Sequence, residues 1–246
     1  MSGPAPSSPS ALPVCHLPYA LDETRNRAHF YENHWKRVAL NLLLRHCSPA
    51  GLSLLDYGCG RGETLDYFGA AGFRATGTDV DVECVRLAGR FGDAVDLRPE
   101  APVEQFGEGS FDVVTCFHVL EHVPCPVQTM TALRRIARRY VVLAVPNLRQ
   151  LCWLFARQIT LDRVNEGHLQ SWDHWHLRNL AERHCGLELV EWGHDATMLP
   201  LLSPLVERCL GMRAAIWVET GPFRRIFPFH GISVIGLFRV QAARPS

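Results

Sequence analysis

The chain has 246 residues, of which 47% are hydrophobic and 20% charged, so a disordered chain or a fibrous repeat is excluded. Its 25 Lys and Arg residues balance 25 Asp and Glu residues. The basic excess typical of a duplex-DNA-binding protein is therefore missing, which argues against a nucleic-acid partner. The longest apolar run, 141–146, is too short to cross a bilayer, so no transmembrane segment is expected.

The nine cysteines are scattered along the chain, and none of them forms a CxxC pair. A disulfide scaffold or a zinc ribbon would cluster its cysteines. We therefore expect free thiols in a reducing compartment. Because the N-terminus also lacks the pattern of a signal peptide, the sequence predicts a cytoplasmic protein.

The N-terminal part is expected to contain a tail and then a helix. Residues 1–18 are rich in Pro, Ser and Ala and predict a disordered tail, which leaves 19–246 as a single domain. Apolar residues at three- and four-residue spacing predict an amphipathic helix over 27–46, which Pro49 and Gly51 end.

Strands and helices then alternate. Strands are expected at 52–57, 73–79, 94–98, 111–117 and 140–145, with helices at 62–71, 82–89 and 127–139 between them. Asp81 can cap the second of these helices. Continuously apolar strands separated by helices predict an α/β fold with a parallel sheet covered on both faces.

The rhythm breaks after Pro146. Segments 148–185 and 195–230 are expected to form a cap, with a helix over 171–185 in the first and irregular, proline-rich chain in the second. Two further strands are expected at 187–192 and 232–240. His174 and His176 are expected on the surface of the helix, because residues two apart cannot face each other.

The densest signal is a strand that runs into three glycines at alternate positions, Gly58, Gly60 and Gly62, and then into a helix. Glycines allow positive φ and a close approach of a ligand to the backbone. Asp56, two residues earlier, would repel a pyrophosphate but suits an ammonium group. Asp79 ends the next strand, where a carboxylate can accept both hydroxyls of a ribose. This pattern disfavours a nicotinamide-dependent oxidoreductase.

Four segments in order, 56–62, 77–80, 110–123 and 141–147, resemble motifs of the class I S-adenosylmethionine-dependent methyltransferases. The likeness is to the small-molecule branch, which includes enzymes of ubiquinone biosynthesis and natural-product methyltransferases. The resemblance implies S-adenosylmethionine as cofactor. It also implies a Rossmann-like, doubly wound, mostly parallel seven-stranded sheet whose last strand is antiparallel.

The resemblance also implies roles for individual residues. It places Asp56, Gly58 and Gly60 at the methionine end of the cofactor, Asp79 at the ribose, Val80 at the adenine, and Phe117 and His118 beside the methionine moiety. The acid that meets the adenine amino group stays open. Glu100 is favoured because it follows the expected strand 94–98, and Asp93 and Asp96 are the alternatives.

Methyl transfer depends chiefly on orientation and on exclusion of water, and needs a general base only when the acceptor loses a proton. His168 is the main candidate on the acceptor side, and His118 is the second, although its ring can simply pack against the cofactor. His118 and His122 flank Glu121, but no third ligand is apparent, so no metal is expected.

The sequence therefore predicts an enzyme that transfers a methyl group from S-adenosylmethionine to an oxygen or nitrogen of a small molecule. The alternatives left open are a protein, RNA or lipid-linked acceptor, and a non-catalytic partner subunit that binds the cofactor. The balanced charge weakens the RNA alternative most.

Overall fold

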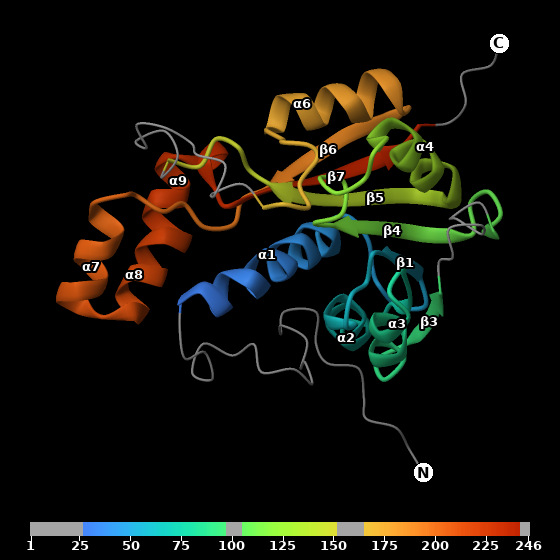
Figure 1. The fold of residues 1–246 in the computed structure, drawn as a ribbon, viewed down its shortest axis with the longest axis horizontal. Helices are drawn as coiled ribbons and strands as arrows, with labels where there is room; N and C mark the ends of the chain where they lie inside the picture. The colour runs from blue at the N-terminus through green and yellow to red at the C-terminus, as the bar shows by residue number, and fades with distance from the viewer. Residues whose placement is uncertain (1–26, 97–104, 152–164, 242–246) are drawn as a thin grey trace.

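The computed structural model describes residues 27–96, 105–151 and 165–241, so the expected tail, 1–18, lies outside the described residues. Its strands form one sheet with the order β3-β2-β1-β4-β5-β7-β6 (Figure 1). They are β1 (Ser53–Tyr57), β2 (Arg74–Asp79), β3 (Asp93–Asp96), β4 (Phe111–Phe117), β5 (Ala137–Pro146), β6 (Leu187–Gly193) and β7 (Ser233–Val240).

The sheet is mostly parallel, which confirms the predicted α/β class. Strand β1 pairs in parallel with β2 and β4, and the parallel pairing continues to β3 on one side and to β5 on the other. Strand β7 runs antiparallel to both of its neighbours. Successive strands are added on one side of β1 up to β3, and then on its other side from β4 onward. In such sheets, ligands bind at the carboxyl ends of the two strands where the order reverses, here β1 and β4.

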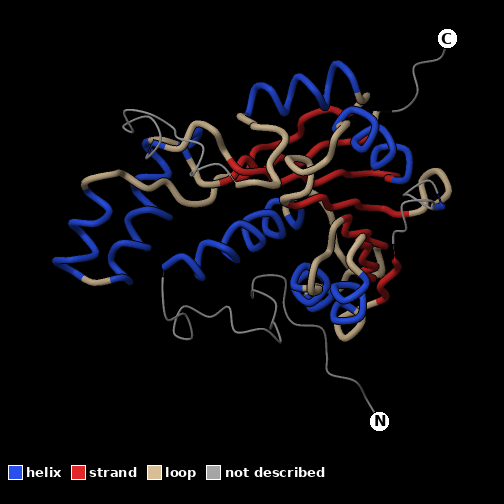
Figure 2. The backbone as a smooth tube through the Cα atoms, viewed as in Figure 1, coloured by secondary structure: helices blue, strands red, loops and turns tan. Residues whose placement is uncertain are grey.

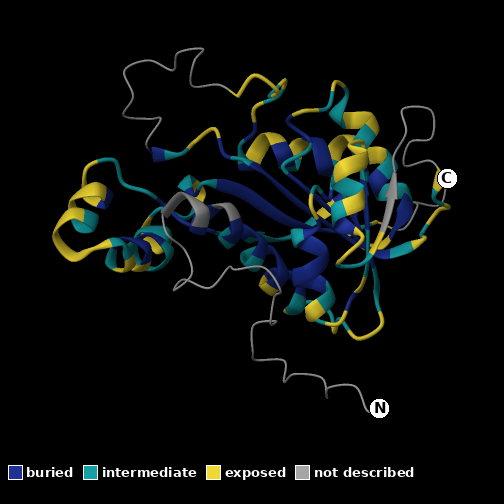
Figure 3. Cartoon of the chain, turned by 60° about the horizontal axis from the view of Figure 1, so that its bottom comes forward, coloured by how far each residue is buried: buried dark blue, intermediate teal, exposed yellow. Residues whose placement is uncertain are grey.

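Helices cover both faces of the sheet (Figure 2). One face carries α1 (Arg27–Leu44), α2 (Glu63–Ala70) and α3 (Val82–Ala88), and the other carries α4 (Pro126–Ile136) and α6 (His174–Asn179), which continues as the π-helix η3 (Leu180–His184). Each face has its own buried core, one built around Trp35, Leu54 and Phe68 and the other around Met130 and Leu133. The strands between the two cores are buried, as Figure 3 shows.

The helix expected over 127–139 ends early, at Ile136. Ala137 adopts an extended conformation and begins β5, so Arg138 and Arg139 belong to a strand and not to a helix end. Ala137 already pairs with Phe111 of β4, and an ion pair between the same strands places Arg138 Nη1 3.0 Å from Asp112 Oδ1. The predicted cap at Asp81 is confirmed, because its Oδ1 accepts from the Glu83 amide at 2.8 Å.

The expectation of irregular chain over 195–230 is wrong. This segment contains α7 (Leu202–Leu210), α8 (Met212–Val218), η4 (Glu219–Phe223), α9 (Arg224–Ile226) and η5 (Pro228–His230). Helices α7 and α8 form a hairpin that projects from the end of the sheet (Figure 1). The segment is anchored to α1, where the Tyr31 hydroxyl donates to the buried Glu219 carboxylate. Prolines at 204 and 228 lie in first turns, where a missing amide costs little.

The surface position expected for His174 is also wrong. Its ring is buried and packs against Trp192 and Phe229, at centroid distances of 4.9 and 5.1 Å. His176 is exposed, as expected. None of the described helices is long and apolar enough to cross a membrane.

Candidate active site

The glycine loop connects β1 to α2 at the carboxyl edge of the sheet. Gly58, Gly60 and Gly62 have φ values of 78°, 52° and 94°, which other residues rarely adopt. A Cβ atom on Gly58 would lie 2.3 Å from Val119 Cγ2, whereas a Cβ on Gly60 would meet nothing within 4 Å. The loop is therefore packed behind Gly58 and open in front of Gly60, and a ligand can approach the backbone there.

Asp79 joins the end of β2 to this loop. Its Oδ2 accepts from the Gly60 amide and its Oδ1 from the Asp81 amide, both at 2.9 Å. An ionised carboxylate offers about four acceptor positions, so both oxygens can still receive ligand hydroxyls. Val80, the next residue, is 75% exposed and offers an apolar surface beside them. Polar and apolar groups in this order beside an open backbone fit a nucleoside.

Asp56 lies behind the loop and is only 1% exposed. The Thr115 hydroxyl donates to its Oδ1 at 2.7 Å. Burial raises the pKa of Asp56 to about 6, while the hydrogen bonds from Thr115 and Thr64 and the charge of Lys36 act in the opposite direction. At neutral pH the group therefore places negative charge behind the glycines.

Lys36 on α1 is a charged residue beside the loop that the sequence reasoning missed. Its side chain is 11% exposed, and its Nζ lies 3.2 Å from Asn33 Oδ1 and 3.9 Å from Glu63 Oε2. The only signal in the sequence was that Lys36 follows Trp35 on the predicted helix. Nothing in the local sequence shows that α1 folds against the glycine loop.

The end of β4 forms the next wall. Phe117 is buried, and the Trp35 ring packs edge-on against it at 5.1 Å. His118 has a φ of 55°, which is a strained value for a residue with a side chain, and its amide donates to Ala144 O at 2.8 Å. This backbone geometry brings the His118 ring to 4.7 Å from Trp35 and its Nδ1 to 3.4 Å from Glu121 Oε1.

His168 reaches the same place from a loop that is distant in sequence. The amides of Leu169 and Gln170 donate to the Glu121 carbonyl at 2.7 and 3.1 Å, which docks the loop. The His168 ring then lies 4.8 Å from the His122 ring, nearly perpendicular to it. Burial, opposed by Glu121, lowers the pKa of His168, and the nearby histidines lower it further. Its imidazole is therefore neutral at pH 7 and can accept a proton.

Glu121, His122 and His168 place one ligand atom each within 4.8 Å of one another. Glu121 is buried, and its Oε2 has no hydrogen-bond partner among the described residues. The sequence argument against a metal rested on His118 and His122 having no apparent third ligand. The structure brings His168 to Glu121 and His122, and His118 is not part of this group. Imidazole and carboxylate ligands suit a first-row divalent ion, and the same groups can also relay a proton.

Three acids, Glu100, Asp93 and Asp96, are candidates for the adenine contact. Glu100 is outside the described residues. In the parallel pairing of β3 with β2, Asp96 is opposite Asp79 and Asp93 is opposite Thr76. Asp96 is therefore at the carboxyl edge, where the candidate site lies, and Asp93 is at the other end of the strand.

Comparison with known proteins identifies the family. A family model described as a methyltransferase domain matches residues 27–191, which is more than half of the chain. The chain belongs to this family. The match begins at α1 and ends in β6, so it includes the glycine loop, Asp79, His118 and His168.

Curated relatives match a part of the chain. The chain is 36% identical over 108 residues to a ubiquinone biosynthesis O-methyltransferase of Aromatoleum aromaticum, a match that covers 41% of this chain and 46% of the relative. A protein of the same name from Pseudomonas paraeruginosa is 36% identical over 128 residues, which is 48% of this chain and 55% of that protein. The chain thus spans about half the length of the curated relatives it matches.

Solved structures share the fold. A magnesium protoporphyrin IX methyltransferase from Synechocystis PCC 6803 with bound S-adenosylmethionine superposes with a TM-score of 0.58 at 15% identity, over 87% of this chain and 82% of that one. At this identity the likeness shows the fold alone, and it confirms a methyltransferase-like α/β architecture.

Proposed function

We propose that this protein transfers a methyl group from S-adenosylmethionine to an oxygen or nitrogen of a small-molecule acceptor. The observation that carries the proposal is that the open backbone at Gly60, with Asp79 beside it, lies at the same sheet edge as His118 and His168. Family membership supports it, and the names of the curated relatives favour an oxygen acceptor. When bound, the cofactor supplies a methyl group on a sulfonium, which needs no further activation.

The residues toward the cofactor follow the geometry of the loop. Gly58 and Gly60 present their backbone to the methionine end, and Asp56 acts there through its charge, since its carboxylate is buried. Asp79 takes the ribose hydroxyls and Val80 the adenine ring. Phe117 and His118 lie beside the methionine end of the cofactor. For the adenine amino group, Glu100 remains a candidate, and the strand register supports Asp96 over Asp93.

On the acceptor side, neutral His168 takes the proton that a hydroxyl loses, and Glu121 orients His118 from 3.4 Å. We place residues 19–246 in one domain, with 148–185 and 195–230 covering the acceptor. The described chain supports this cover, because the His168 loop docks on Glu121. Asn147, at the end of β5, also donates to the carbonyls of Phe229 and Gly231 at 3.1 and 2.9 Å.

Calorimetric titration with S-adenosylmethionine and S-adenosylhomocysteine tests the cofactor assignment. We expect micromolar binding that is lost in Asp79→Ala and retained in the control Asp93→Ala, which removes an exposed carboxylate from the far end of the strand. Absence of binding by the folded protein would contradict the proposal. Binding without turnover on a panel of phenols, catechols and amines would contradict its catalytic part.

A further inference from the structure

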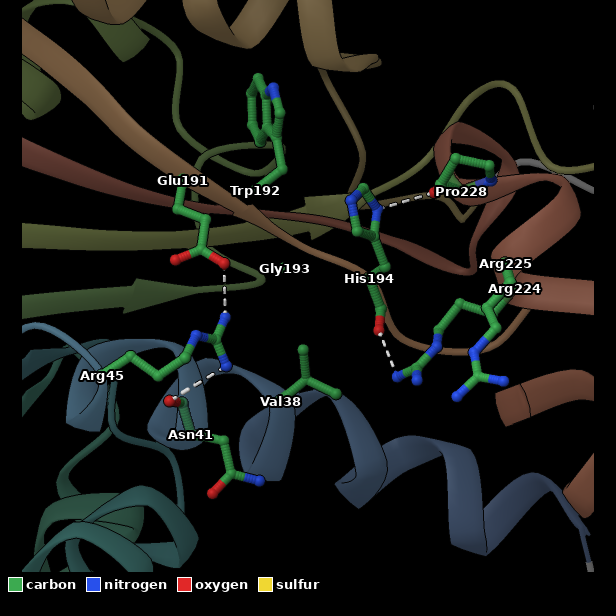
Figure 4. Close-up of a pocket in the computed structure, with 10 residues that line it drawn as sticks. All are labelled: Val38, Asn41, Arg45, Glu191, Trp192, Gly193, His194, Arg224, Arg225 and Pro228. Atoms are coloured by element: carbon green, nitrogen blue, oxygen red, sulfur yellow. Dashed lines mark hydrogen bonds and ion pairs between the residues drawn. The ribbon is translucent and has the colours of Figure 1, made fainter. Parts of the chain in front are cut away.

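A second cavity lies on the other side of α1, away from the glycine loop. It has a volume of about 390 Å³ and runs between α1, the edge strand β6 and the segment from α9 to η5 (Figure 4). Pockets of this size accommodate small ligands. Val38 and Pro228 contribute its apolar lining. Arg224, Arg225 and Pro228 belong to the segment 195–230, but no residue given an individual role at the cofactor or the acceptor lines the cavity.

The acid in this cavity is already neutralised. Glu191 Oε1 lies 2.7 Å from Arg45 Nη2, and Glu191 Oε2 lies 2.7 Å from His46 Nε2. Glu191 and Arg45 lie at one end of the cavity, as Figure 4 shows. Because both oxygens of Glu191 are already paired, its carboxylate does little to neutralise the cations at the other end of the cavity.

The other end holds two adjacent arginines, neither of which forms an ion pair with a carboxylate in the described part of the chain. Arg224 is half-buried and donates to the His194 carbonyl at 3.2 Å. Arg225 is exposed and makes no hydrogen bond or ion pair with any residue that the structure describes. Asp195 acts on Arg224 by its charge, but its two oxygens accept from the amides of Ile232 and Ser233.

Burial and the positive charge of Arg225 lower the pKa of Arg224, so the two guanidinium groups repel each other, and an oxyanion between them removes that cost. Their planar donor forks match phosphate oxygens in a bidentate manner. We propose that this cavity binds a phosphate-bearing small molecule, with the phosphate at Arg224 and Arg225 and the remainder of the ligand against Val38 and Pro228. The inference does not depend on the chemistry of the cofactor site.

Titration calorimetry with inorganic pyrophosphate tests the site in four full-length proteins at low ionic strength. We expect Arg225→Gln to weaken binding at least tenfold, because it removes a cation that has no structural partner. Glu191→Gln should tighten binding, since it releases Arg45 from its ion pair and leaves one more uncompensated cation in the cavity. The control Arg208→Gln, which removes an exposed cation from α7 outside the cavity, should leave the affinity unchanged.

Thermal unfolding of each variant shows that the fold is intact. Equal affinities of Arg225→Gln and Arg208→Gln, or no binding by the unaltered protein, would overturn the proposal. Citrate that binds more tightly than pyrophosphate would overturn the assignment to phosphate. Weaker pyrophosphate binding at saturating S-adenosylhomocysteine would place the anion in the cofactor site and would also overturn it.

Discussion

Replacement of Gly60 by alanine separates the conformational role of this glycine from its role toward the ligand. At a φ of 52°, an alanine costs about 1–2 kcal/mol in the folded state, of which about 0.4–1 kcal/mol is recovered from the stiffer unfolded chain. No atom lies within 4 Å of the new methyl group, so no clash adds to this cost. We expect a net loss of about 1 kcal/mol in unfolding free energy, or roughly 2–4 °C in Tm.

Cofactor binding should suffer far more than stability, because the methyl group occupies the open space that the ligand needs. Overpacking of one methyl group costs about 1–3 kcal/mol, which corresponds to a Kd about 5–150-fold higher. Gly51→Ala is the matched control, since Gly51 also has a positive φ of 76° and open surroundings but precedes β1, at the opposite end of the strand. Denaturation and calorimetry should show equal stability losses in the two variants and a binding defect in Gly60→Ala alone. If both variants bind S-adenosylmethionine within twofold of each other, the loop does not face the cofactor.

Three further predictions concern the charged groups. His168→Gln should lower kcat by about 10²–10⁴-fold without changing cofactor affinity, and an unchanged kcat would exclude His168 as the base. Because the pKa of His168 is lowered, the activity of the unaltered enzyme should fall on the acid side only below pH 6.5. The pKa of Asp56 is raised from 3.8 to about 6 on folding, so the unaltered protein should lose stability as the pH rises from 4 to 6. Asp56→Asn should lack this loss and be the more stable protein at pH 7. Parallel curves of unfolding free energy against pH for the two proteins would refute this. Methyl transfer should persist in EDTA, and a loss that one divalent ion restores would show that Glu121, His122 and His168 hold a catalytic metal.

The features that the sequence could predict are those encoded by neighbouring residues. The glycine loop, the cap at Asp81 and the strand 111–117 each depend on a few consecutive side chains, and the structure places them where they were expected. The spacing from Gly60 to Asp79 predicted their proximity for the same reason, because a single helix between β1 and β2 brings the end of β2 back beside the loop. The Gly60 amide nitrogen lies 2.9 Å from Asp79 Oδ2.

The features that the sequence could not predict arise from contacts between distant segments. His168 joins Glu121 across 47 positions, so the cluster with a third ligand appears only when the two loops dock. The helix ends at Ile136 because the chain pairs from Ala137 onward with β4, which is distant in sequence. The prolines of 195–230 suggested irregular chain, but buried contacts such as Tyr31 with Glu219 hold helices there.

Helix α1 connects the two proposed sites, and its geometry gives a reason to expect coupling between them. At 100° per residue, Val38, Asn41 and Arg45 lie roughly opposite Lys36 on the helix. Lys36 lies beside Glu63 at the start of α2, whereas Val38, Asn41 and Arg45 line the second cavity. A ligand that holds α1 against the segment from α9 to η5 therefore also fixes the wall formed by Trp35 and Lys36. Coupling between two binding sites is reciprocal, so each ligand changes the affinity for the other by the same factor.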